Sequence, residues 1–419
     1  MIKLFKKIFS TSFVNVSSIF GSLFINYILA NVFGPAGVGI VNISNKTLNI
    51  FSVFSQTGLR SVILRDNSGN KDNSISDSFR ASVVVNGLIS LFLTISIICI
   101  IHFYGSLIYE ESNGIFEAVT ITILALFPIV ISQLLSSFFA AKKNPIFATF
   151  IDQTGVVILT SLILMALWYN DKSKLTIDLI LYVYLGCRVL VLLFSISAFR
   201  YKNFKLSPLL ISTKYIKESS HLFVNTFMGV LNANMDIFII TYFLPIEQVG
   251  VYAIASRLGT FLGFIEKVIM TVSGPEIVKI YKSSEINELS KYIGNLRKLL
   301  CLIAIIAFFI YFHFGKEILI FFGKDFVIGY DILLILSFAT LIRLSAGPNG
   351  LLLTMTKFDR LKKNISIFSF FLLLILSFPL TGIYGLYGAA LAKLCTVFCE
   401  NGLQIYYSKK NILNKINGT

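Results

Sequence analysis

The sequence predicts an all-α protein that crosses a membrane many times, and three observations predict it. Hydrophobic residues make up 56% of the 419 residues and charged residues only 14%, whereas soluble domains usually carry about a quarter charged residues. Apolar stretches of about 20 residues, enough for a helix to cross ~30 Å of hydrocarbon, recur along the whole chain. Finally, the connections between these stretches alternate between many and few basic residues. Together these features exclude an ordinary soluble enzyme.

We expect twelve transmembrane helices. They cover approximately residues 10–31, 38–59, 82–103, 118–140, 147–169, 176–199, 219–241, 249–275, 295–313, 330–356, 364–382 and 386–407. No large soluble domain interrupts them, because the longest connections have only about 20 residues.

The basic residues report the orientation of the spans. The connections on one side, which include both chain ends, hold 26 of the 36 Lys and Arg residues, whereas those on the other side hold only 4. Cytoplasmic connections carry such an excess, so we expect both termini in the cytoplasm. The net charge of +15 therefore reflects topology, and no nucleic-acid partner is expected.

The predicted spans divide into two similar halves of six. We predict an N-terminal lobe at 1–200, a cytoplasmic linker at 201–218 and a C-terminal lobe at 219–419. Segment 26–51 aligns with segment 236–262 with one inserted residue. The alignment pairs Asn26 with Asp236, Pro35 with Pro245, Gly39 with Gly250, and Lys46 with Arg257. Because six is even, both halves enter the membrane from the same side, which predicts a parallel repeat about a pseudo-two-fold axis along the membrane normal.

Polar residues recur on one face of several predicted spans. In the second span Asn42, Asn45 and Asn49 share a helix face at spacings of three and four residues, and Lys46 borders that face. Similar polar positions are Asn26 in the first span, Asn232 and Asp236 in the seventh, and Arg257 and Lys267 in the eighth. Unpaired polar groups are costly in lipid, so these faces are expected to meet one another or a water-filled cavity.

These polar residues have a structural and a functional explanation, and both are open. Asn side chains often serve only to hold membrane helices together, and Asp236 is a candidate ion-pair partner for Lys46 or Arg257. Intramembrane cations, however, often mark a substrate path. The carboxylates in the spans (Asp236, Glu266, Asp152 and Glu400) are fewer than the cations, which also include Arg188, Arg343 and Lys393. We therefore expect a positive cavity that binds an anionic substrate.

The binding hypothesis assigns a role to each polar residue. Substrate is expected to contact Lys46, Arg257, Asn42, Asn45, Asn49, Asn26, Asn232 and Lys267. Tyr27, Tyr242 and Tyr252 offer further partners for hydroxyl groups. Asp236 is expected to bind H⁺ or Na⁺, or to pair with a cation of the cavity, when substrate is absent. No metal ligand set, catalytic residue or phosphate-binding loop is found, and no other cofactor is expected.

Three stretches of the chain carry a resemblance to a known family. They are "VFGPAGVGIVN", "MDIFIITYFLPIEQVGVYAIASRLGTF" and "FPLTGIYGLYGAALAKLCTVFCENGLQIYYSKK". With the 6+6 pattern they resemble the polysaccharide-unit flippases, the Wzx-type O-antigen transporters of the multidrug/oligosaccharidyl-lipid/polysaccharide exporter superfamily. The likeness covers essentially the whole chain.

The resemblance implies a function and a location. It implies a two-lobed transporter in the bacterial cytoplasmic (inner) membrane. By alternating access, it would move an undecaprenyl-pyrophosphate-linked oligosaccharide, such as an O-antigen or capsule repeat unit, from the inner to the outer leaflet. Spans 1, 2, 7 and 8 would line its cavity. Its partners would be membrane lipids, and the polysaccharide polymerase and chain-length regulator.

Three alternatives remain open from the sequence. A lipid II or teichuronic-type flippase would share the mechanism. A multidrug exporter of the same superfamily would carry organic cations, against which Lys46 and Arg257 argue. A membrane glycan polymerase or ligase would need a sizeable catalytic loop, and the outer connections at 102–114 and 313–329 are too short to build one. We therefore expect a transporter and no enzyme.

Overall fold

The computed structural model describes residues 2–68, 76–108, 114–142, 144–199, 209–283, 286–356 and 358–413, and within these ranges it is helical with no strand. The α-helices are α1 (Ile2–Ser55), α2 (Leu59–Ser68), α3 (Asp77–Ile108), α4 (Ile115–Ile123), α5 (Leu126–Ala141), α6 (Pro145–Thr149), α7 (Gly155–Asn170), α8 (Ile177–Ala198), α9 (Leu209–Phe243), α10 (Ile246–Gly259), α11 (Gly263–Lys282), α12 (Ile286–Phe322), α13 (Tyr330–Ala346), α14 (Asn349–Met355) and α15 (Asp359–Ser408). Short 3₁₀ or π turns are η2 (Phe150–Thr154), η3 (Lys172–Lys174), η4 (Lys324–Gly329) and η5 (Lys409–Leu413). The predicted all-α class is confirmed.

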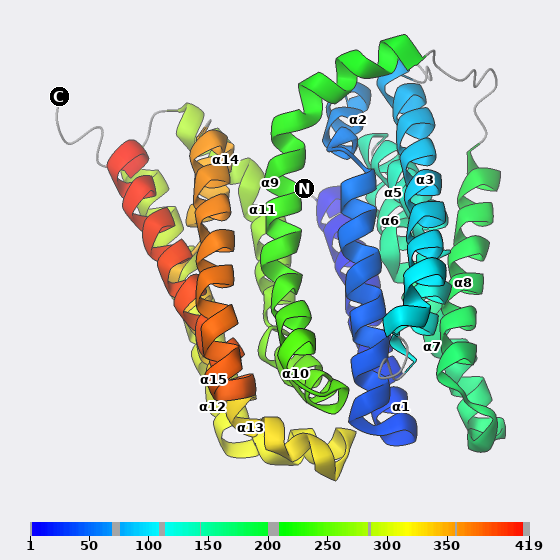
Figure 1. The fold of residues 1–419 in the computed structure, drawn as a ribbon. Coiled ribbons are helices and arrows are strands. Elements are labelled where there is room, and N and C mark those ends of the chain that lie inside the picture. Colours follow the sequence, from blue (N-terminus) through cyan, green and yellow to red (C-terminus); the bar gives the residue numbers. More distant parts are fainter. Residues whose placement is uncertain are drawn as a thin grey trace. The chain divides into compact units, whose positions relative to one another are not determined.

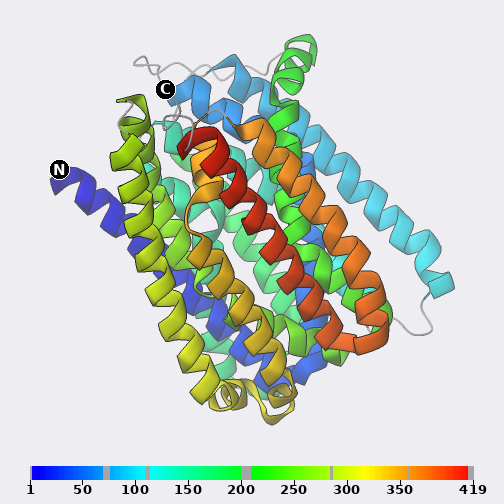
Figure 2. The ribbon, with the colours of Figure 1, turned by 90° about the vertical axis from the view of Figure 1, so that its left-hand side faces the viewer.

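Eight of the described helical segments are long and apolar enough to span a membrane, or nine if α4 and α5, bent by 43°, cross as one. Two of these segments each contain two predicted spans. The chain turns inside α1 at Gly34 (φ 63°) and inside α15 at Gly385 (φ 58°), and glycine adopts such φ values at little cost. Figures 1 and 2 show the two legs of α15, in orange and red, running side by side. The number twelve stays a prediction, since α10 has only 14 residues.

The chain forms two compact units. Unit 1 contains Met1–Phe33 and Ile40–Val230, and unit 2 contains Gly34–Gly39 and Leu231–Thr419. The division after residue 230 lies inside α9. This helix begins at Leu209, so its first residues belong to the predicted linker at 201–218. Residues 201–208 lie outside the described ranges, and the predicted domain limits stay predictions.

The core of unit 1 surrounds α5. This helix packs against α2, α3 and α8, with Leu126, Leu134 and Phe138 fully buried. The ring of Phe138 lies 4.8 Å from the ring of Phe79 on α3, centroid to centroid. Since such rings contribute large buried apolar areas, this cluster fixes how the helices of unit 1 pack.

Unit 2 is organised around α13, which packs against α10, α12 and α15. A second cluster joins α11, α12, α14 and α15 through buried side chains that include Ile277, Leu289, Leu352 and Ile365. These contacts position the polar residues of α9, α10 and α15 described below.

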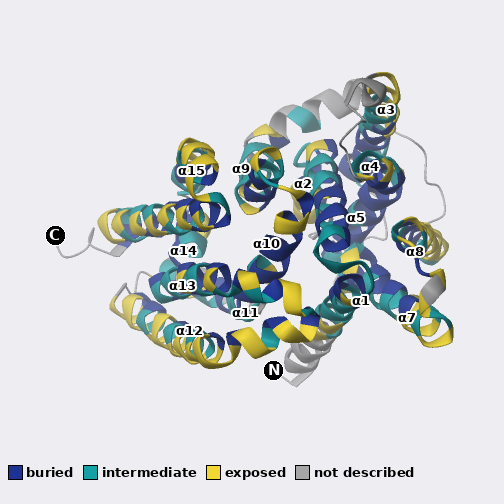
Figure 3. Cartoon of the chain, turned by 60° about the horizontal axis from the view of Figure 1, so that its bottom comes forward, coloured by how far each residue is buried: buried dark blue, intermediate teal, exposed yellow. Residues whose placement is uncertain are grey.

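Large apolar side chains are exposed along the long helices. Phe92 on α3, Ile375 on α15 and Leu190 on α8 have exposed fractions of 68%, 68% and 56%. Figure 3 shows such exposed residues along one side of α8 and of α12. Contiguous exposed apolar faces are rare in soluble proteins, whereas lipid solvates them. The described helices thus have the surface of a multi-pass membrane protein.

A reciprocal close contact within unit 2 joins Gly39 and Gly250. A Cβ atom added to Gly250 would lie 1.8 Å from the carbonyl oxygen of Pro35, and one added to Gly39 would lie 2.4 Å from that of Ile246. Pro35 lies four residues before Gly39, and Ile246 lies four residues before Gly250. Each glycine therefore contacts the carbonyl group that lies four residues before the other glycine. This reciprocity agrees with the predicted two-fold repeat, whose sequence alignment pairs the same two glycines.

Candidate functional site

Arg257 is an exposed cation inside a predicted span. It lies in the last turn of α10, and its side chain is exposed. Within the part of the chain that the structure describes, no carboxylate is within ion-pair distance of it. Since no hydrogen bond from Arg257 to the described residues is found either, its guanidinium group has donors for another partner.

The predicted polar face on α1 is partly open. Asn42, Asn45 and Lys46 are half-buried and Asn49 is exposed. These residues belong to unit 1 and Arg257 belongs to unit 2. Asn26, in the first leg of α1, is 5% exposed, and its amide nitrogen donates to the carbonyl oxygen of Ser22 at 2.6 Å. Asn26 thus lies deeper in its unit than the residues of the predicted face.

Asp236 on α9 is buried in unit 2, and its cationic partner is Lys393 on α15. The Lys393 Nζ lies 3.4 Å from Asp236 Oδ2, and the exposed fractions of the two side chains are 18% and 5%. The hydroxyl of Tyr252 donates to the same oxygen at 3.1 Å, and the Ile237 backbone N–H donates to Asp236 Oδ1 at 3.0 Å. Tyr252 is fully buried, so its hydroxyl has a partner inside the unit, Asp236, instead of the hydroxyl groups of a substrate.

Asn232 joins this cluster one helical turn before Asp236. Its carbonyl oxygen accepts a hydrogen bond from Lys393 Nζ, and its amide nitrogen donates to the Ser366 carbonyl oxygen at 3.0 Å. Asn232 Oδ1 is buried and accepts no hydrogen bond from the described residues. We call Asn232, Asp236, Tyr252 and Lys393 the Asp236 cluster.

The other three carboxylates of the predicted spans also have cationic partners. Asp152 lies 2.8 Å from Arg60, Glu266 lies 3.2 Å from Arg343, and Glu400 lies 2.7 Å from Lys362, measured between charged atoms. The first pair belongs to unit 1 and the others to unit 2. With Asp236, all four carboxylates are thus compensated within their own units, so none of them cancels the charge of Arg257.

Two further cations of the predicted spans are Arg188 and Lys267, and the structure describes the side chain of Arg188 only. Arg188 is 2% exposed. It donates to the Tyr184 hydroxyl at 2.7 Å and to the Asp152 carbonyl oxygen at 3.2 Å, so it serves packing within unit 1. Lys267 lies on α11, and its side chain lies outside the described part of the structure.

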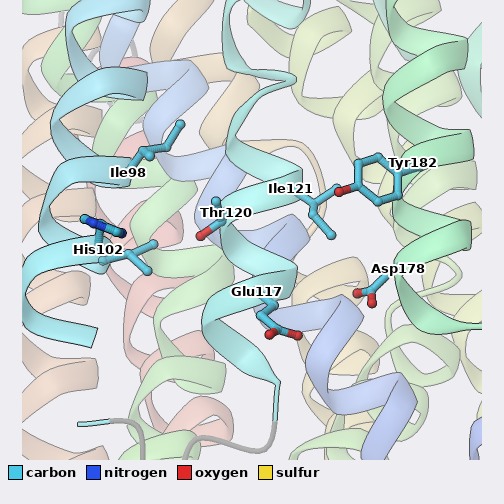
Figure 4. A pocket seen from close by; sticks show the side chains of 8 residues that line it. Ile98, His102, Glu117, Thr120, Ile121, Asp178 and Tyr182 are labelled. Carbon is cyan, nitrogen blue, oxygen red and sulfur yellow. The ribbon is translucent and has the colours of Figure 1, made fainter. Parts of the chain in front are cut away.

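Each unit also contains a pocket lined by acidic and aromatic side chains. The pocket of unit 1, of about 780 Å³, is lined by residues that include His102, Glu117, Asp178 and Tyr182. Figure 4 shows Glu117 and Asp178 on facing helices. The pocket of unit 2, of about 620 Å³, is lined by residues that include Glu247, Asp325, Tyr384 and Tyr387.

The arrangement of these helices identifies the superfamily to which the fold belongs. Their fold is that of the multidrug/oligosaccharidyl-lipid/polysaccharide exporter (MOP) superfamily. An inward-facing multidrug resistance MATE family transporter of that superfamily matches with a TM-score of 0.69 at 13% identity, over 97% of this chain and 96% of that chain. A Pyrococcus furiosus MOP transporter, described by the reverse polarity of its binding pocket, matches with a TM-score of 0.67 at 13% identity, over 99% and 97%. At such identities the likeness concerns the fold alone.

The chain belongs to the polysaccharide biosynthesis protein family, whose model matches residues 4–281. The capsular polysaccharide biosynthesis protein CapF of Staphylococcus aureus is 25% identical over 341 residues, which cover 78% of this chain and 83% of that protein. The predicted resemblance is thereby confirmed at the level of family and superfamily.

Sequence reasoning missed the partners of the buried charges. Lys393 was an intramembrane cation of unassigned role, and Arg60 was counted as part of a cytoplasmic connection. Helical spacing relates residues on one span, whereas Lys393 and Asp236 are 157 positions apart on α15 and α9. The available signal was that the spans contain carboxylates as well as cations, which indicates pairing without saying which residues pair; the partners Arg60 and Lys362 were not among those cations.

Proposed function

We propose that the protein is a flippase that moves an undecaprenyl-pyrophosphate-linked oligosaccharide, an O-antigen or capsule repeat unit, from the inner to the outer leaflet of the cytoplasmic membrane. It is a multi-pass protein with both termini in the cytoplasm. Membership in the polysaccharide biosynthesis family supports a glycan substrate, and the fold supports transport by alternating access. The polymerase and the chain-length regulator are the proposed partners.

The observation that carries this proposal is the exposed guanidinium of Arg257, which has no carboxylate partner among the described residues. A pyrophosphate is a compact anion, and charge-assisted hydrogen bonds from Arg to phosphate are among the stronger protein contacts. A cation without a carboxylate partner in a largely apolar protein is costly. An anionic substrate would offset that cost. An organic cation would increase it, because it would add a second positive charge.

The remaining predicted residues complete the proposed site. Lys46, the counterpart of Arg257 in the repeat, and Lys267 would add positive charge around the pyrophosphate. Asn42, Asn45 and Asn49 would bind sugar hydroxyls through their amide groups. Asn26 and Asn232, which are more enclosed, would contribute by positioning the helices that carry the site.

No catalytic role is proposed. A glycan polymerase would need a folded loop outside the membrane, and the predicted outer connection at 313–329 is largely helical. There α12 continues to Phe322, and η4 covers Lys324–Gly329. This segment leaves little chain for a catalytic loop.

Deletion of the gene tests the proposal. We expect undecaprenyl-linked repeat units to accumulate on the cytoplasmic side of the membrane, and a plasmid copy of the gene to reverse the accumulation. Normal amounts of surface polysaccharide in the deletion strain, in the absence of a second flippase gene, would contradict a role in flipping.

A second candidate function is export of organic cations, and the pocket of unit 2 favours it. Glu247 and Asp325 line that pocket beside Tyr384 and Tyr387, and carboxylates with aromatic rings are suited to cations. Within the described residues neither carboxylate has a cationic partner. Drug sensitivity of the deletion strain separates the two functions. Increased sensitivity to cationic dyes, with unchanged lipid-linked intermediates, would favour the exporter.

A further inference from the structure

The Asp236 cluster brings several oxygen atoms to one nitrogen. Lys393 Nζ lies 3.4 Å from Asp236 Oδ2 and donates to the carbonyl oxygen of Asn232. The Asn232 side chain belongs to the same residue as that carbonyl, and its Oδ1 is buried without a donor among the described residues. A carboxylate oxygen and a backbone carbonyl oxygen thus contact the ammonium, and the buried amide oxygen of Asn232 has no donor among the described residues.

Oxygen atoms of these kinds are also ligands of hard cations. Alkali and alkaline-earth ions prefer carboxylate, carbonyl and amide oxygens. Here an ammonium group carried by the chain takes that position. The side chain of Asp236 is 5% exposed, so its negative charge requires a partner within the protein. The neighbouring donors, the Tyr252 hydroxyl and the Ile237 N–H, are neutral.

We propose that the oxygens of Asn232 and Asp236 form a binding site for a small monovalent cation, and that the ammonium group of Lys393 occupies this site in place of Na⁺. The native protein therefore binds no Na⁺ at Asp236. Removing the ammonium group while retaining the oxygens opens the site to Na⁺ from solution. This inference concerns unit 2 alone and does not depend on the proposed substrate.

The proposal also changes the role expected for Asp236. An ion that enters from one side and leaves on the other can couple transport to an ion gradient, whereas a tethered ammonium stays with the chain. The substrate cycle would then draw no energy from a Na⁺ gradient through this carboxylate.

The test measures binding of ²²Na⁺ to the full-length protein in detergent. We expect no saturable binding to the wild type, and saturable binding to Lys393→Met that unlabelled NaCl displaces. The double variant Asp236→Asn/Lys393→Met keeps the shape of the cluster without its charge and should bind no ²²Na⁺. Lys410→Met, which removes an exposed lysine in η5, serves as the matched control and should behave as the wild type.

Thermal unfolding in NaCl and in choline chloride gives a second readout. Na⁺ should raise the Tm of Lys393→Met by a few degrees and leave the wild type unchanged, because a ligand that binds only the folded state stabilises it. Saturable ²²Na⁺ binding by the wild type that Asp236→Asn abolishes would overturn the proposal. So would a folded Lys393→Met that binds no ²²Na⁺, or a Lys393→Met that fails to fold even in NaCl, because Na⁺ would then not replace the ammonium.

Discussion

At the scale of residues, Arg257 and Asp236 show how one unit treats two charges differently. Asp236 is buried and paired with Lys393, whereas Arg257 is exposed and has no carboxylate partner among the described residues. The first charge is compensated within the fold. The second is available to a ligand, which is the basis of the proposed anion site.

The exposed arginine leads to the first prediction. Arg257→Gln should reduce surface polysaccharide at least tenfold, because the pyrophosphate would lose a charged partner. Arg257→Lys should retain more function, since it keeps the charge but not the two-pronged geometry. The measurement is surface polysaccharide normalised to the amount of protein in the membrane. Arg360→Gln, which removes an exposed arginine at the start of α15, is the matched control and should leave the amount of surface polysaccharide unchanged.

The depth of the ion pairs leads to the second prediction. Asp236→Asn should lower the free energy of unfolding by roughly 3–5 kcal/mol, because it leaves the Lys393 charge buried without a partner. Glu266→Gln should cost less, about 0–1 kcal/mol, because the Arg343 side chain is 37% exposed and the Lys393 side chain only 18%. Thermal unfolding of the purified variants compares the two. Equal losses would show that burial does not determine the strength of these pairs.

The sequence indicated which residues are candidates at this scale but not their contacts. The charge and spacing of Arg257 were sufficient to single it out. Lys393 and Tyr252 could not be assigned as partners of Asp236, because α9, α10 and α15 meet only in the folded unit. A count of charges in the spans cannot distinguish a paired cation from an available one.

At the scale of elements, glycine determines where helices turn and where they cross. Gly34 and Gly385 have positive φ values at the turns inside α1 and α15. Gly39 and Gly250 lie in close contact with backbone carbonyls. Helices can approach this closely in membrane proteins only where side chains are absent.

The glycine contact leads to the third prediction. Gly250→Ala should destabilise unit 2 or prevent its folding, because the added Cβ would lie 1.8 Å from the Pro35 carbonyl oxygen, a backbone atom. Gly294→Ala on α12 is the control, since a Cβ there meets nothing within 4 Å. Alanine also has the higher helix propensity, so this control should be neutral or slightly stabilising. Fluorescence-detected size-exclusion chromatography after heating reports both effects, and equal stability of the two variants would contradict the contact.

Much of the element pattern could be predicted from the sequence, because apolar stretches of membrane-spanning length are a strong signal. The turn at Gly34 falls between two predicted spans, as does the turn at Gly385. The break between α10 and α11 at residues 260–262 lies inside one predicted span and was not predicted. The break contains no proline, but Gly259 and Gly263 flank it, and the prediction followed the apolar stretch across these glycines.

At the scale of the whole molecule, the charge distribution predicts the topology. In a variant without its five cysteines, new cysteines at Asn73 and Asn203 should react with a membrane-impermeant maleimide only after the cells are opened. Cysteines at Tyr169 and Ile328, whose side chains are 88% and 74% exposed, should react in intact cells from which any outer membrane has been removed. Labelling at Asn203 in intact cells would contradict the predicted orientation.

The orientation also determines how the membrane potential acts on the proposed substrate. A pyrophosphate diester carries about two negative charges, and each charge that crosses the field is worth roughly 2.3 kcal/mol per 100 mV. Outward movement would therefore gain about 4–5 kcal/mol per 100 mV in a cell with a negative interior. A potential negative inside the vesicle should accelerate outward movement, while a Na⁺ gradient alone should have no effect if Lys393 occupies the cation site.

The most direct test of the central claim is movement of the lipid-linked glycan by the purified protein. Proteoliposomes are prepared with an undecaprenyl-pyrophosphate-linked oligosaccharide in both leaflets, and a glycan-cleaving enzyme is added outside. We expect wild-type protein to render nearly all the substrate cleavable. Arg257→Gln proteoliposomes, like protein-free vesicles, should leave about half of it protected. Equal protection with and without wild-type protein, together with uptake of a cationic dye by the same vesicles, would contradict the proposed flippase function.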